Sequence, residues 1–263
     1  MADEKIRLGG MALPNGVLVH GPTAWAAAIR HPDGRLEVAS ARKRFRASGV
    51  RTPLLRGPAR LAEAMAILPE VKRKLPAAKL PFQSRGAIAS MVGAAVAARG
   101  LRDSERLRPA ARELLSGLVS LAPAALALRG SELAAYHGAE HISIGTYEHG
   151  KGATKEHERC GGHLVGPLLA TSVFGNVLAG LAPERVRNQA RTAAQFGAIA
   201  ASTEIFGWMT RHPDNLVAKT LSRPGHELQH RLSTAEPSEE QLEVAEAALA
   251  ACLELEHGAD DTH

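Results

Sequence analysis

The stretch from Leu164 to Ala182 holds no charged residue, and this feature most constrains what the chain can fold into. An uncharged apolar run of about 18 residues or more is either a transmembrane span or a helix buried in a protein core. This run is only weakly apolar, because it includes Pro167 and Asn176 among several small residues. The neighbouring candidate, residues 192–208, contains Glu204, and a carboxylate inside a span is costly. We therefore expect a soluble protein with buried helices, with membrane association as the alternative.

The N-terminal region has the pattern of β-strands. Gly16 to His20 is a short apolar run, and two further runs, Trp25 to Ile29 and Leu36 to Val38, flank the turn sequence Pro32-Asp33-Gly34. Apolar runs joined by an Asp-Gly turn predict an antiparallel hairpin. We expect a small antiparallel β region over residues 1–48.

From residue 49 onward the chain has the pattern of helices. Apolar and helix-favouring residues recur at helical spacing, and a Pro-Ser pair precedes the last such segment. A further helix that opens near Ser131 carries a histidine motif, and the polar, Gly-rich stretch 149–163 predicts a loop. The predicted fold class is α+β and mainly α-helical: the β region packs on a helical bundle, residues 49–263, in one integrated domain with a histidine-rich metal site. The other predicted helices cover residues 61–68, 86–98, 108–121, 164–182, 188–211 and 239–256.

Composition narrows the classes of protein. A chain of 263 residues can bury a core without disulfides, and Cys160 and Cys252 are its two cysteines, so we expect a reducing, cytoplasmic location. The N-terminus carries acidic residues and no apolar stretch typical of a secretory signal. The net charge of +5 is modest and aromatic residues make up 3% of the chain. Single-strand binders need aromatic stacking platforms, so no specific nucleic-acid partner is expected.

The segment Tyr136-His137-Gly138-Ala139-Glu140-His141 carries the first candidate chemistry. On a helix, residues four apart share one face, so His137 and His141 can bind one ion. The order His-x-x-Glu-His is that of the inverted zincins, in which two histidines hold Zn²⁺ and the glutamate acts as general base. The alternative is an ordinary helix with two surface histidines.

A second segment adds ligand-type residues. His157 and Cys160 lie three apart in the Gly-rich stretch, a spacing that can bend around one ion. Together with the first pair they predict a metal site of His137, His141, His157 and Cys160. Imidazole and thiolate favour zinc, with iron and copper as alternatives. Glu204 is a second catalytic candidate beside Glu140; the alternative is a helix carboxylate paired with Arg211.

Motifs along nearly the whole chain resemble the YqhQ-like family of bacterial proteins of unknown function. They are the two histidine segments, Gly9-Gly10-Met11-Ala12, Leu55-Arg56-Gly57, and the tail from Arg211-His212-Pro213-Asp214-Asn215, in the family's order. The resemblance implies a metal-dependent enzyme. Members are typically embedded in a membrane, whereas the middle helices here are diluted with small and polar residues. The chain thus resembles a soluble member, for which a role in a specialised biosynthetic pathway is an expectation.

Three functions remain open from the sequence. The first is a metal-dependent hydrolase or lyase that uses a metal-activated water, with Glu140 as base, on a small polar substrate. The second is a structural metal protein that serves as an interaction or membrane-associated module. The third is an iron or copper redox protein that uses Cys160. Formation of a homo-oligomer is also left open.

Overall fold

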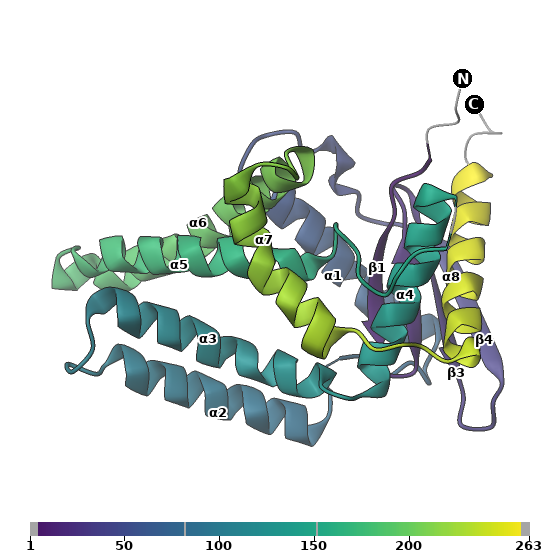
Figure 1. Cartoon of the computed structure of the whole chain (residues 1–263), viewed down its shortest axis with the longest axis horizontal. Helices are drawn as coiled ribbons and strands as arrows, with labels where there is room; N and C mark the ends of the chain where they lie inside the picture. The colour runs from purple at the N-terminus through teal and green to yellow at the C-terminus, as the bar shows by residue number, and fades with distance from the viewer. Residues whose placement is uncertain (1–4, 82, 151, 259–263) are drawn as a thin grey trace.

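The N-terminal region forms a four-stranded antiparallel sheet in the computed structural model, which describes residues 5–81, 83–150 and 152–258 (Figure 1). Each strand pairs with the next in the chain, so the order in the sheet is β1-β2-β3-β4. Gly34 has a φ of 85° in the turn between the last two strands, at the position where the sequence predicts a hairpin turn. The strands are β1 (Gly9–Leu13), β2 (Gly16–His20), β3 (Ala24–Arg30) and β4 (Leu36–Arg42).

Both faces of this sheet are covered by helices. Along β3, Trp25 and Ile29 face α1 (Arg56–Lys74) and pack with Ile67 and Val71 of that helix. The alternate β3 residues face α4 (Glu132–His149) and α8 (Glu239–His257) on the other side. A sheet covered on both faces explains why β3 is apolar at successive positions.

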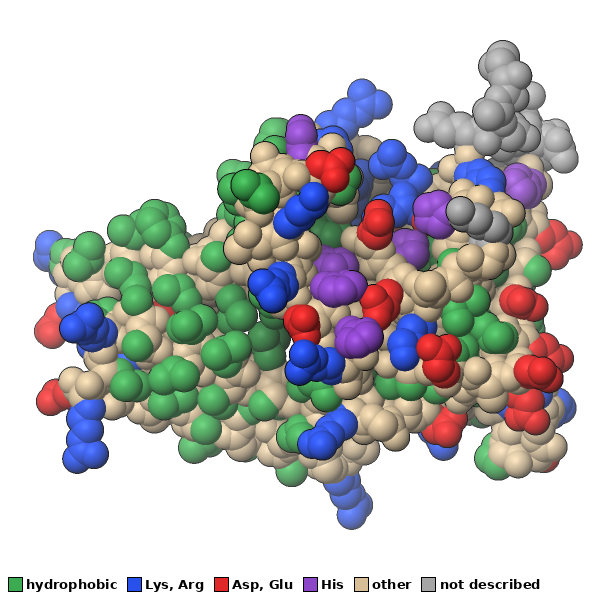
Figure 2. Space-filling view, in the orientation of Figure 1, with side chains coloured by type: hydrophobic (Ala, Val, Ile, Leu, Met, Phe, Trp, Pro, Cys, Tyr) green, Lys and Arg blue, Asp and Glu red, His purple; other side chains and the backbone are tan. Residues whose placement is uncertain are grey.

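The remaining long helices form an arm that projects from the sheet (Figure 1). The arm consists of two helical pairs, α2 (Arg85–Arg102) with α3 (Pro109–Leu128) and α5 (Val165–Gly180) with α6 (Glu184–Arg211). Many apolar side chains on it are exposed, among them Phe174 (67%), Phe196 (71%) and Leu181 (80%). Figure 2 shows hydrophobic side chains spread over one face of the arm. Two segments, Pro109–Leu128 and Gly161–Gly180, are long and apolar enough to cross a membrane by length and composition alone.

The predicted fold class, α+β and mainly α-helical with an N-terminal antiparallel region, is confirmed. The prediction did not include β1 or α7 (Leu216–Leu228). Helix α7 contains Pro224 and Gly225, which argue locally against a helix. It nevertheless packs on α5 and on η2 (Gly161–Leu164), and the π-helical turn η3 (Gln229–Ser233) follows it directly.

Candidate metal centre

Helix α4 places the two histidines of the motif on one face. Ser131 caps the helix by accepting a hydrogen bond from Ala134 N–H, and Gly150 ends it with a φ of 68°. Between these ends the rings of His137 and His141 lie one turn apart, with centroids separated by 4.3 Å. The helix itself is therefore enough to bring two ligand-type side chains together.

The chain after α4 folds back and brings a thiol to the same place. Gly145 of α4 allows this close approach, because a Cβ there would lie 2.8 Å from Cβ of Ala153. Cys160 Sγ then lies 3.5 Å from His137 Nε2. One ligand atom from each of His137, His141 and Cys160 lies within 4.8 Å of the other two. Three of the four predicted ligands thus form a cluster, called the triad below.

Backbone carbonyls hold both imidazoles of the triad by the nitrogen that faces away from it. His137 Nδ1 lies 2.7 Å from the Ser233 carbonyl oxygen, and His141 Nδ1 lies 2.6 Å from that of Lys155. A carbonyl only accepts, so each Nδ1 carries the hydrogen and each Nε2 keeps a free lone pair. Metal-binding histidines have the same arrangement. The donor set of two imidazole nitrogens and one thiol sulfur suits Zn²⁺.

Burial keeps the triad side chains in their uncharged forms. It lowers the pKa of His137 and lowers that of His141 to about 3, where the neighbouring His137 adds to the effect. It also raises the pKa of the Cys160 thiol to about 12. A divalent cation reverses this balance for the thiol, because it stabilises the thiolate directly. Two neutral imidazoles beside a buried thiol are therefore a suitable site for such a cation.

His157, the fourth predicted ligand, lies next to the triad but is engaged elsewhere. Its ring centroid is 5.6 Å from that of His141. Its Nε2 lies 3.1 Å from a carboxylate oxygen of Glu148, and its Nδ1 accepts a hydrogen bond from Arg159 N–H. Both ring nitrogens thus have partners outside the triad.

The Glu140 side chain is buried against β1, on the face of the sheet that α4 covers. A Cβ on Gly10 would lie 2.5 Å from Glu140 Cδ and 2.7 Å from Cγ, so the glycine makes room for this carboxyl. Burial raises the pKa of Glu140 to about 8. Glu140 directly precedes His141 in α4, and the charge of its ionised form adds to the raised pKa of Cys160.

Glu204, the other catalytic candidate, connects two helices. Its carboxylate accepts hydrogen bonds from Arg56 Nε at 2.8 Å and from Leu54 N–H at 3.1 Å, and Arg56 lowers its pKa. The partner is Arg56, at the start of α1, rather than the Arg211 that the sequence suggested. A role in fixing α1 to α6 explains these contacts.

Motif spacing did not assign Gln229 or Ser233 to the metal site. Gln229 is fully buried, and its Oε1 accepts a hydrogen bond from His157 N–H. Its Nε2 lies 2.9 Å from Nε2 of His163, whose Nδ1 lies 3.2 Å from the Ser222 carbonyl. Gln229 and Ser233 belong to the π-helical turn, and such turns are frequent at functional sites. Neither has a ligand-type side chain that motif spacing could have revealed.

The comparison with protein families matches the part of the chain that carries this site. Residues 131–255 match the family described as "Protein of unknown function (DUF1385)". The DUF1385 match begins at the cap of α4, covers the triad and Gln229, and ends in α8. It supports the expected resemblance to an uncharacterised family. No curated protein and no solved structure matched the chain.

Proposed function

We propose that this chain is a metal-dependent enzyme whose ion, Zn²⁺, is held by His137, His141 and Cys160. The observation that supports this most is the triad itself: three ligand atoms within 4.8 Å of one another, with both histidines oriented by backbone carbonyls. Ligands held in this way from outside are typical of functional metal sites. Iron and copper remain alternatives for the same donors.

A catalytic role is favoured over a structural one by the number of ligands. Structural zinc sites are closed by four protein side chains, whereas catalytic sites use three and leave one position to water or substrate. Among the residues that the structure describes, the triad supplies three. His157, whose ring lies 5.6 Å from that of His141, is engaged with Glu148.

The proposed reaction is hydrolysis, or addition of water, on a small polar substrate. Bound Zn²⁺ would supply Lewis-acid activation of the water or of the substrate carbonyl. Glu140 would accept the proton that the water loses as its oxygen bonds to the carbonyl carbon, while the electrons of the C=O π bond move to the carbonyl oxygen. In hydrolysis, the protonated Glu140 would then give this proton to the leaving group as its bond to the carbon breaks. Among the described residues no cationic side chain pairs with Glu140, and burial raises its pKa to about 8, so the carboxyl can take up a proton near neutral pH.

A structural metal site is the second candidate, and the position of His157 favours it. The ring of His157 lies 5.6 Å from that of His141, so a rotation of this side chain could supply a fourth ligand. The site would then be closed, and the chain would act as an interaction module.

Elemental analysis of the purified protein tests the metal. We expect about one zinc per chain in the wild type, and loss of at least about tenfold in zinc affinity in His137→Ala and Cys160→Ser. The control is His149→Ala, an exposed histidine at the end of the same helix. Wild-type protein without metal, or ligand variants that keep it, would refute the site.

Cobalt substitution separates the two kinds of site. In an open site, the visible spectrum of the Co²⁺ protein should change on addition of acetohydroxamate, because this ligand takes the remaining position. In a closed site, the spectrum should not respond. The His157→Ala variant should respond like the wild type if His157 is not a ligand.

A further inference from the structure

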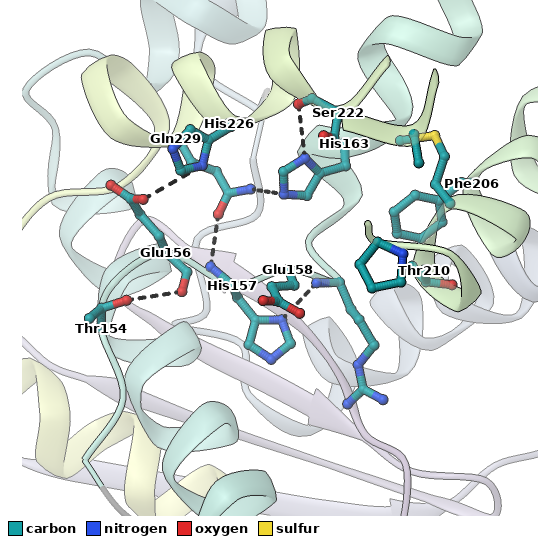
Figure 3. A pocket seen from close by; sticks show the side chains of 14 residues that line it. Thr154, Glu156, His157, Glu158, His163, Phe206, Thr210, Ser222, His226 and Gln229 are labelled. Atoms are coloured by element: carbon teal, nitrogen blue, oxygen red, sulfur yellow. Dashed lines mark hydrogen bonds and ion pairs between the residues drawn. The ribbon is translucent and has the colours of Figure 1, made fainter. Parts of the chain in front are cut away.

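A pocket of about 490 Å³ is lined by His157, the histidine next to the triad, and by residues of α6 and α7 (Figure 3). It is formed by the loop 154–159, by the last turns of α6 and by α7, and its two walls differ in chemistry. His157, His163 and Gln229 lie on one side, and Phe206 lies across from them in Figure 3. Glu156, Glu158, Arg159 and His226 also line the pocket, so one wall is polar and charged and the other is apolar, which suits a small molecule with two unlike ends.

The polar wall is held together by hydrogen bonds and lies beside the triad. Gln229 connects two histidines by hydrogen bonds: its Oε1 accepts from His157 N–H, and its Nε2 contacts Nε2 of His163. A Cβ on Gly162 would lie 3.6 Å from Cys160 Sγ and 3.8 Å from Gln229 Cγ, so these two side chains flank the same glycine. His157 completes the connection, with its ring 5.6 Å from that of His141. A ligand that contacts His157 in the pocket is therefore separated from His141 by that one side chain.

The apolar wall continues to the rim of the pocket. Phe206, Met209, Pro213 and Ala218 line it, and Met209 and Ala218 are buried. A ligand that lies along this wall is therefore in contact with the apolar side chains of Phe206, Met209 and Ala218.

We infer that the pocket binds an amphipathic substrate, with its polar, carbonyl-bearing end at His157 and an acyl or alkyl chain along Phe206, Met209 and Ala218. The inference rests on the proposed function only for the polar end, which the metal would bind. Binding of the acyl or alkyl part of the substrate depends on the apolar wall alone. A substrate without a chain would leave this wall in contact with water, and each methylene buried there should tighten binding about two- to fourfold.

Calorimetry with a series of alkyl hydroxamates tests the inference. The hydroxamate group binds zinc, and the chain length varies from acetohydroxamate to octanohydroxamate, at concentrations below micelle formation. For the zinc-loaded wild type we expect affinity to rise by at least about 50-fold across the series. Phe206→Ser should flatten this rise, and Phe206→Leu should restore it. Phe196→Ser, an exposed phenylalanine on the same helix that does not line the pocket, is the control.

The outcomes separate the two proposals. If acetohydroxamate binds the wild type no better than His137→Ala, the metal proposal fails, but the rise with chain length should persist. If acetohydroxamate binds through the metal and octanohydroxamate binds no tighter, the amphipathic substrate is refuted. The amphipathic substrate is also refuted if affinity rises equally with alkyl chain length in Phe206→Ser and in the wild type, provided that circular dichroism shows the variant to be folded.

The acyl or alkyl chain of the substrate can belong either to a free molecule or to a membrane lipid. Flotation of the protein with phosphatidylcholine vesicles distinguishes the two sources. Binding to the vesicles that octanohydroxamate reduces supports a lipid substrate, and hydroxamate binding without flotation supports a free one.

Discussion

The packing of Glu140 under β1 leads to a prediction for Gly10→Ala. The added Cβ would lie 2.5 Å from Glu140 Cδ, whereas ordinary contacts begin near 3.4 Å, so the carboxyl group must move by about 1 Å. Glu140 is only 6% exposed, which leaves it little space to move into. Overpacking of this kind costs about 1–3 kcal/mol. We expect the free energy of unfolding to fall by that amount.

A double-mutant cycle shows whether Glu140 is the cause. In a Glu140→Ala background the overlapping atoms are absent, so Gly10→Ala should be neutral or slightly stabilising there. The coupling free energy between the two sites should therefore be about 1–3 kcal/mol, measured by urea unfolding followed by circular dichroism. Gly93→Ala is the control, because no atom lies within 4 Å of that added Cβ in the middle of α2, and it should stabilise by up to about 1 kcal/mol.

Two results would contradict this reasoning. One is a Gly10→Ala protein as stable as the wild type. The other is an equal loss of stability in both backgrounds, which would mean that the strand itself, and not the buried carboxyl, resists the methyl group.

Three further predictions concern other positions. Gly138→Ala places a Cβ against the Ala235 carbonyl. The variant should therefore lose several kcal/mol of stability or lose zinc binding. A variant that keeps both its stability and its zinc would contradict this packing. Glu256 accepts hydrogen bonds from Thr23 N–H at 2.8 Å, from its hydroxyl at 2.8 Å and from Ala24 N–H, so Glu256→Ala should cost about 2–4 kcal/mol in urea unfolding. Burial, with help from Lys43, lowers the pKa of His20 to about 4 from 6.5. Between these pH values the unfolded chain binds a proton that the folded chain does not, so stability should fall by up to about 3 kcal/mol as pH drops from 6.5 to 4. His20→Gln should remove this share of the pH dependence; an identical slope in the variant would show that other groups cause it.

Local patterns were sufficient to predict the elements that depend on neighbouring residues. The turn at Gly34 follows from its Asp-Gly pair, and the start of α8 from Ser238, whose side chain and that of Gln241 form a capping box. The pairing of His137 with His141 follows from the helical repeat alone. In each case the interacting groups lie within a few residues of one another, so the chain order fixes their geometry.

Contacts between distant segments could not be predicted in this way. The sequence offered Arg211 as the partner of Glu204, yet the carboxylate binds Arg56, 148 positions away in the chain. Helix α7 forms although it contains Pro224, because its packing on α5 and η2 stabilises it. Spacing alone could not rank His157 against Cys160 as a ligand of the triad.

The sequence by itself determined that α4 carries two histidines on one face and that a thiol follows in a Gly-rich loop. Only the tertiary structure decided which residue joins them: Cys160 approaches His137, while Glu148 and Arg159 engage His157. It also supplied the carbonyls of Ser233 and Lys155 that orient the imidazoles. The physical reason is that helical geometry depends on backbone hydrogen bonds between near neighbours, whereas a buried polar group takes its partner from whichever distant segment is packed against it.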